Sequence, residues 1–306
     1  MIFKHLQRSV STVNYIPRTM STRTNDKNNI LVERLGEVTT IGTNRPDKRN
    51  CIDHETAEML ENAIADFEKD NDAHVGVLYG TGGNFCAGFD FDEIANLEDL
   101  QKSTTDQKAQ FSILQSRKFL RKPMIAALSG YAVAGGLELA LLCDLRVMEE
   151  TAVVGLYARR FGVPLVDGGT VRLPAVVGLS RALDLILTGK SLNAKEAFEW
   201  GLVNRIVACG TSLGQALQLA VCLAKFPQEC LSSDRDSAYN SAFSQVYADL
   251  IKYEKDNADN ISLKSIVEGA KKFISGVGKH GKTYNLRERD YLDWEKEYNQ
   301  TAKSKL

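Results

Sequence analysis

Short apolar runs alternate with amphipathic stretches along the first part of this chain. Residues 30–34 and 38–43 have strand-like patterns, and Leu35-Gly36-Glu37 between them predicts a β-hairpin. Compact apolar runs typical of buried strands follow at residues 75–79, 124–128 and 145–148. The first of these runs ends in a glycine-rich stretch, where the chain is expected to turn.

The polar positions between these runs predict turns and helices. Residues 44–50 read Asn-Arg-Pro-Asp-Lys-Arg-Asn, which predicts a polar turn with a basic cluster. Asp53 is a suitable N-cap for the helix that follows. The apolar face of this helix carries Met59, Leu60, Ala63, Ile64 and Phe67. The alternation of strands and helices predicts an α/β fold with a largely buried sheet.

Beyond about residue 180 the pattern becomes mainly helical. Helices are expected at residues 182–187, 194–200, 213–225, 237–253 and 263–274. Gly189, Gly201 and Gly210 are the expected stops. Residues 283–306 are highly charged with interspersed aromatic residues, a pattern that fits either a helical arm on the body or a partner contact.

Composition narrows the classes of function. The chain has 306 residues, of which 43% are hydrophobic and 25% charged, with a formal net charge of -1. This balance is typical of a soluble protein with one large core. The near-neutral charge argues against a nucleic-acid partner, and the apolar runs are too short for a membrane span.

Cysteine and histidine usage provides no sign of a disulfide framework or a metal site. The six cysteines lack CxxC or other paired spacing, which is typical of reduced thiols. The chain has four histidines and no HExxH motif. We therefore expect no metal.

Residues 1–28 have the profile of a mitochondrial transit peptide. Basic residues lie among Ser and Thr, no acidic residue precedes Asp26, and apolar residues recur at helical spacing. The alternative is an untargeted tail. Met20 is a possible internal start for a cytosolic form.

One carboxylate, Glu138, lies in an otherwise apolar segment just after Gly135-Gly136. A helix that opens at these glycines presents backbone N–H groups that suit an anionic oxygen, such as that of a thioester enolate. Glu138 is then within reach of the carbon next to the same carbonyl. The alternative is that Glu138 only complements the helix dipole. A buried carboxylate without a partner is costly, which favours a functional role.

A second glycine-rich junction, Phe85-Cys86-Ala87-Gly88-Phe89-Asp90, also follows an apolar strand. Together with the Gly-Gly-Leu-Glu motif at 135–138, it resembles the crotonase (enoyl-CoA hydratase/isomerase) superfamily. The resemblance extends from about residue 29 to residue 281. Its landmarks lie at residues 44–50, 85–90, 130–144, 167–174 and 187–207.

The resemblance implies a core of repeated ββα turns over residues 29–210 and a helical trimerisation region over residues 211–306. Assembly is expected as a homotrimer or a dimer of trimers. The Ala87 and Gly135 N–H groups would form an oxyanion hole for an acyl-CoA thioester. Arg45, Lys48 and Arg49 would bind coenzyme A, whose phosphates call for basic side chains. The alternative for Ala87 and Gly135 is that they are ordinary turn positions. The alternative for the three basic residues is that they are solvated surface charges.

The sequence departs from the family pattern at one catalytic position. A hydratase of this family uses two glutamates around one water, and Glu138 matches the first. The second falls at Ala158, beside Arg159 and Arg160. Asp167, before Gly168-Gly169, is the nearest carboxylate that could replace it. The alternative is an ordinary turn or cap aspartate.

The resemblance implies an acyl-CoA enzyme, and hydration of a 2-enoyl-CoA with Glu138 and Asp167 as the catalytic pair is the leading hypothesis. Isomerisation or decarboxylation with one carboxylate, thioester hydrolysis, and non-catalytic acyl-CoA binding are the alternatives. RNA binding on the same fold would need a larger basic stripe than residues 45–49 provide. No cofactor is expected, because coenzyme A is part of the substrate. The implied setting is fatty acid β-oxidation in the mitochondrial matrix.

Overall fold

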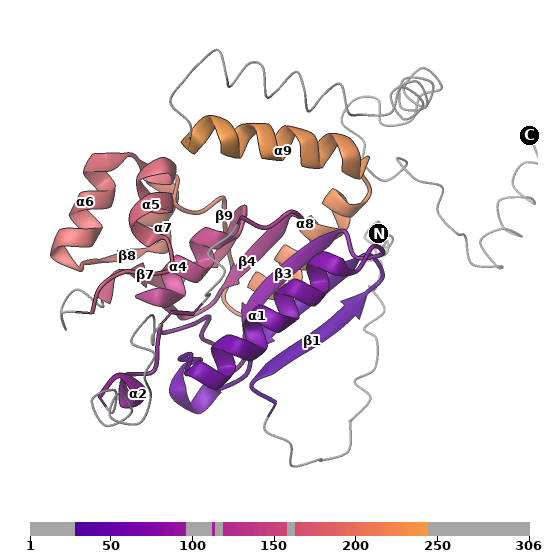
Figure 1. Ribbon diagram of the computed structural model, residues 1–306. Coiled ribbons are helices and arrows are strands. Elements are labelled where there is room, and N and C mark those ends of the chain that lie inside the picture. Colours follow the sequence, from indigo (N-terminus) through magenta and orange to yellow (C-terminus); the bar gives the residue numbers. More distant parts are fainter. Residues whose placement is uncertain (1–27, 96–111, 114–118, 158–162, 244–306) are drawn as a thin grey trace, which may run out of the picture.

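The central feature of the computed structural model is a mixed sheet, shown in Figure 1 with the described residues 28–95, 112–113, 119–157 and 163–243 in colour. Its strand order is β1-β2-β3-β4-β6-β9. The strands are β1 Ile30–Leu35, β2 Val38–Thr43, β3 Val75–Gly80, β4 Met124–Leu128, β6 Leu145–Glu149 and β9 Arg205–Val207. β1 and β2 pair antiparallel, and the other neighbours pair parallel.

A small second sheet and a set of helices complete the described part. The second sheet has the order β5-β7-β8, with β5 Tyr131–Val133, β7 Val153–Gly155 and β8 Ser191–Asn193. The helices are α1 His54–Lys69, α2 Phe91–Ala95, α4 Gly135–Leu142, α5 Gly169–Val177, α6 Leu179–Thr188, α7 Ala194–Glu199, α8 Ser212–Ala224 and α9 Gln228–Phe243. A 3-10 turn, Pro46–Lys48, follows β2. No described helix is long and apolar enough to cross a membrane.

The main sheet lies between two apolar layers. In β4, Met124, Ala126 and Leu128 face the cluster that contains α1 and α4. Ile125 and Ala127 face a separate cluster built on α8. Alternate side chains of a strand point to opposite faces, so this all-apolar run is buried on both sides, as the sequence predicted. The predicted α/β fold is confirmed.

The predicted hairpin and the first helix are also confirmed. In the β1–β2 hairpin, Ile30 lies opposite Thr43 at one end and Leu35 lies opposite Val38 at the other. Asp53 caps α1, where its side chain accepts a hydrogen bond from Thr56 N at 2.9 Å. A side-chain acceptor at this position satisfies one of the free N–H groups of the first helical turn.

Other predictions differ from the structure or lie outside the described residues. α9 begins at Gln228, nine residues before the predicted start at 237. α5 was not predicted, because Gly168, Gly169 and Pro174 indicate a turn in the sequence. The predicted transit peptide (apart from Asn28), the helix at 263–274 and the charged segment 283–306 lie outside the described residues.

Candidate active site

Glu138 lies in the first turn of α4, directly after the short strand β5. The helix is preceded by Ala134, whose φ of 53° is uncommon for a residue with a side chain. This turn directs the chain from β5 into α4 within one residue. Glu138 is consequently buried, with only 2% of its surface exposed.

Two backbone N–H groups bind the Glu138 carboxylate. Asp167 N and Gly169 N donate to Oε1 at 3.0 and 2.9 Å. No hydrogen bond from the described residues reaches Oε2. A side chain at residue 169 would have no room, because a Cβ there would lie 2.8 Å from Glu138 Oε1. Asp167 and Gly169, at the start of α5, therefore fix one oxygen of the carboxylate.

Burial raises the pKa of Glu138 from 4.5 to about 7. Desolvation is the largest cause, and the Gly169 N–H opposes it by stabilising the charged form. The Asp167 charge raises the pKa further, whereas the Arg172 charge lowers it. A carboxyl with a pKa near neutrality can both accept and donate a proton at physiological pH.

The two glycine-rich turns meet at the start of α4. A Cβ on Gly88 would lie 2.9 Å from Ala134 Cβ and 3.2 Å from Gly135 N, so the turns are in close contact. Gly135 N–H has no acceptor among the described residues. Ala87 N–H, in contrast, donates to Arg49 O at 3.1 Å and would have to release that bond to contact a ligand.

Phe89 was not predicted as a donor of the oxyanion hole, but its N–H has no acceptor in the described part of the chain. Ile52 N donates to Gly88 O, and Asp90 N donates to Ile52 O, both at 2.8 Å. In such a bridge the residue between the bonded groups directs its own N–H to the opposite side. Only the pairing with Ile52 reveals this direction, so the sequence carried no signal for it.

Asp167 lies next to Glu138, as predicted, but through its main chain. Its side chain is 5% exposed and turns to another segment, where Oδ1 accepts from Ser112 Oγ at 2.5 Å and Oδ2 from Ile113 N at 3.1 Å. Its carbonyl accepts from Arg172 Nη1 at 2.7 Å. Ala158, where the family pattern places the second glutamate, lies outside the described residues.

The three basic residues predicted to bind coenzyme A differ in their surroundings. Arg45 Nη2 pairs with Asp53 at 2.8 Å and Asp90 at 3.0 Å, and the Arg45 side chain is only 17% exposed. Lys48 is more exposed and pairs with Asp92. Arg49 lies over the ring of Tyr131, 5.3 Å from its centroid. Arg45 is therefore held within the protein, whereas the other two border solvent.

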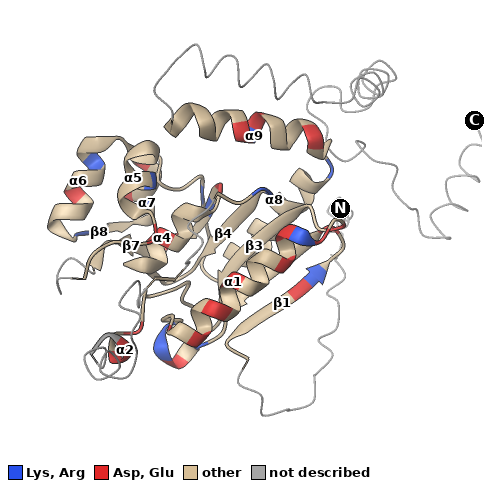
Figure 2. Cartoon of the chain, in the orientation of Figure 1, with Lys and Arg blue, Asp and Glu red and all other residues tan. Residues whose placement is uncertain are grey.

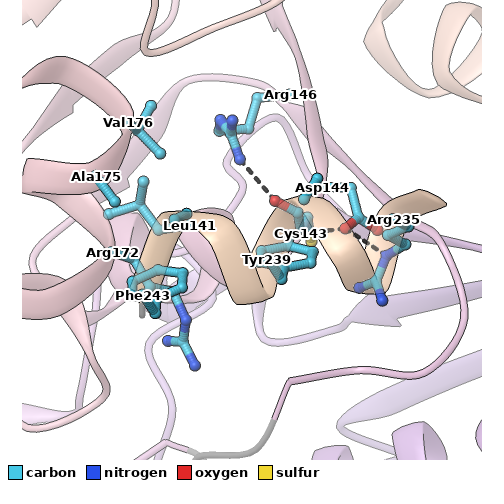
Figure 3. A pocket seen from close by; sticks show the side chains of 12 residues that line it. Leu141, Cys143, Asp144, Arg146, Arg172, Ala175, Val176, Arg235, Tyr239 and Phe243 are labelled. Atoms are coloured by element: carbon cyan, nitrogen blue, oxygen red, sulfur yellow. Dashed lines mark hydrogen bonds and ion pairs between the residues drawn. The ribbon is translucent and has the colours of Figure 1, made fainter. Parts of the chain in front are cut away.

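Arg172 also borders a cavity of about 300 Å³ (Figure 3). The cavity lies between the end of α4, α5 and α9, and its lining includes Arg146, Arg235, Tyr239 and Phe243. Its lining does not include Glu138 or Asp167. The described part of the chain holds no group of three or more His, Cys, Asp or Glu residues suited to a metal ion.

Comparison with known proteins identifies the family of this chain. The model of the enoyl-CoA hydratase/isomerase family matches residues 33–276. A probable enoyl-CoA hydratase of Mycobacterium bovis is 33% identical over 226 residues, which are 74% of this chain and 86% of the relative. The mouse enoyl-CoA hydratase domain-containing protein 2, mitochondrial, is 38% identical over 190 residues, with coverages of 61% and 64%.

Solved structures show the same fold. An enoyl-CoA hydratase of Mycobacterium tuberculosis superposes with a TM-score of 0.71 at 29% identity, covering 81% of this chain and 96% of that one. A probable enoyl-CoA hydratase/isomerase of Mycobacterium abscessus gives a TM-score of 0.74 at 28% identity, with the same coverages. The chain belongs to the enoyl-CoA hydratase/isomerase family, within the crotonase superfamily.

Proposed function

We propose that this protein is an acyl-CoA enzyme that hydrates a 2-enoyl-CoA, with Glu138 as its acid and base. The observation that carries the proposal is the buried Glu138 carboxyl, fixed by two N–H groups through one oxygen and with a pKa of about 7. It lies beside the start of α4, where backbone N–H groups can stabilise an enolate oxygen. The relatives named enoyl-CoA hydratase support the same reaction.

The thioester oxygen would be bound by Gly135 N–H and a second donor from the facing turn. Phe89 N–H is the better second donor, because Ala87 N–H already binds Arg49 O. Preorganised donors of this kind stabilise the negative charge that develops on the oxygen. Ala87 remains the alternative if its bond to Arg49 opens on binding.

One carboxylate is sufficient for both proton transfers of the hydration. Glu138 removes a proton from water as the water oxygen bonds to the β-carbon, and the double-bond electrons move to form the enolate. The enolate then collapses, and Glu138 returns the proton to the α-carbon. The water supplies both the hydroxyl and the added hydrogen, so Glu138 ends in its starting state.

Isomerisation of an enoyl-CoA is the second candidate. It needs one group that removes a proton from one carbon and returns it to another. The replacement of the second glutamate by Ala158 favours it, and so does the Asp167 carboxylate, which is bound to Ser112 and Ile113.

Several further properties are part of the proposal. Lys48 and Arg49 would contact the phosphates of coenzyme A, with Arg45 supporting the loop. No separate cofactor is required. We propose a homotrimer or dimer of trimers in the mitochondrial matrix, in fatty acid β-oxidation; relatives from mouse and Dictyostelium discoideum are named mitochondrial.

The test is the ultraviolet absorbance of crotonyl-CoA with the purified chain. Loss of the conjugated-enoyl signal at about 10 per second or more would support hydration. An unchanged signal, with conjugation gained from a 3-enoyl-CoA, would favour isomerisation. Binding of thioesters without turnover of enoyl or malonyl-type substrates would favour a non-catalytic binding protein.

A further inference from the structure

The polar atoms of Asp167 are used by three other parts of the site. Its N–H donates to Glu138 Oε1, and its carbonyl accepts from Arg172. Its two carboxylate oxygens accept from Ser112 Oγ and Ile113 N. We infer that Asp167 is a positioning residue that ties the 112–113 segment to Glu138, and that it does not transfer protons.

The direction of the Asp167 side chain carries this inference. Hydrogen bonds from Ser112 and Ile113, at 2.5 and 3.1 Å, stabilise the charged carboxylate in a place that is 95% buried. To act on a water beside Glu138, the side chain would have to leave both donors buried and unpaired, which is costly. The Asp167 main chain already serves Glu138 without such a rearrangement.

The same connection places an apolar side chain beside the thioester-binding turn. A Cβ on Gly135 would lie 2.7 Å from Ile113 Cδ1, so Ile113 packs directly on the Gly135 backbone. Ile113 is 1% exposed. Asp167 thus binds Glu138 through its N–H. Through its carboxylate it binds Ile113, which covers the start of α4.

Three variants test the function of Asp167. The turnover assays rest on the proposed reaction. Asp167→Asn keeps the shape, because its amide oxygen can accept from Ile113 N and its NH₂ can donate to Ser112 Oγ. The amide of this variant cannot act as a general acid or base. Asp167→Ala and Ser112→Ala break the connection instead, Ser112→Ala by removing one of its two donors.

Positioning predicts that Asp167→Asn keeps crotonyl-CoA turnover within about tenfold of wild type, because the geometry is rescued. Ser112→Ala and Asp167→Ala should each lower kcat by about 10²-fold, and the double variant should be no worse, since both break one connection. A proton-transferring Asp167 predicts the reverse order. Inactive Asp167→Asn with fully active Ser112→Ala would overturn the inference.

Amide hydrogen exchange provides a readout that does not depend on turnover. Ser112→Ala should accelerate exchange at the Asp167 and Gly169 amides about tenfold or more, because these donors lose their support. The control is Ser212→Ala, which removes a buried 2.8 Å bond from Ser212 Oγ to Glu149 outside the site. Unchanged exchange at Asp167 and Gly169 would refute the positioning role of Asp167, whether or not the wild type turns over crotonyl-CoA. A wild type that is inactive on crotonyl-CoA would refute only the proposed reaction.

Discussion

At the scale of single residues, the properties of Glu138 come from its neighbours. It lies in the buried stretch of α4 from Gly136 to Leu142, and the N–H groups of Asp167 and Gly169 orient it. Desolvation by burial is the largest cause of the rise of the Glu138 pKa to about 7. The sequence indicated the buried carboxylate, since its neighbours in residues 137–142 are apolar. It could not indicate the two donors, because they lie at the start of a helix, and Gly168, Gly169 and Pro174 indicate a turn there instead.

The raised pKa of Glu138 predicts a pH-dependent stability. Between pH 4.5 and about 7 the unfolded chain has released this proton while the folded chain keeps it, so the free energy of unfolding falls as pH rises. The loss attributable to Glu138 is up to about 3 kcal/mol. Glu138→Gln should remove it and flatten the curve. Denaturant titrations of both proteins at pH 5 and pH 8 provide the measurement, and parallel curves would contradict the assignment.

Gly169 leaves the space that Glu138 occupies. In Gly169→Ala the new methyl group would lie 2.8 Å from Glu138 Cγ and Oε1, so the carboxyl must move. We expect kcat to fall at least about tenfold, because small displacements of a catalytic group are costly. The measurement is steady-state turnover of crotonyl-CoA. Gly214→Ala in α8, which has open space around it, is the control and should retain full activity.

At the scale of elements, the strands and the first helix follow from local pattern, whereas the site depends on contacts between turns. Residues 124–128 were predicted with the observed bounds, because an all-apolar run fits a strand covered on both faces. The directions of the Ala87 and Phe89 N–H groups depend on where residues 49 and 52 pass. No local pattern specifies such long-range pairing.

The loop between β2 and α1 also makes long-range contacts that its local sequence does not specify. Binding of coenzyme A by Arg45 stays a prediction, and the structure adds that its guanidinium bridges Asp53 and Asp90. Arg45→Met should therefore destabilise the protein by about 1–3 kcal/mol, because it leaves Asp90 buried without its partner. Lys48→Met removes only an exposed pair and should leave stability unchanged. Thermal unfolding of the two variants distinguishes these effects, and equal stabilities would contradict the structural role of Arg45.

At the scale of the whole molecule, charged residues of both signs are interspersed along the described part of the chain. Figure 2 shows Lys and Arg interspersed with Asp and Glu over the helices and strands, which agrees with the formal net charge of -1. The most prominent apolar surface is on α6, where Leu179, Leu183 and Leu187 are 64%, 40% and 70% exposed. Their spacing of four residues places them on one side of the helix. Exposed apolar stripes are typical of association surfaces.

The proposed oligomer therefore predicts a mass of three or six times 33.8 kDa in light scattering. Leu187→Glu should lower that mass, because a charge would be buried in the contact. Val32→Glu, at a 56% exposed residue of β1, is the control and should not lower it. A wild-type mass of one chain would contradict the proposed assembly.

Proton transfer by Glu138 during turnover is best measured by the rate of crotonyl-CoA hydration in Glu138→Gln. The amide keeps an oxygen for the two N–H donors but cannot exchange a proton. We predict a loss of kcat of about 10²-fold or more, with the dissociation constant for the CoA ester near that of wild type. Glu149→Gln, at a buried carboxylate bonded to Ser212, is the matched control. Full activity of Glu138→Gln would show that Glu138 is not the acid and base of the reaction.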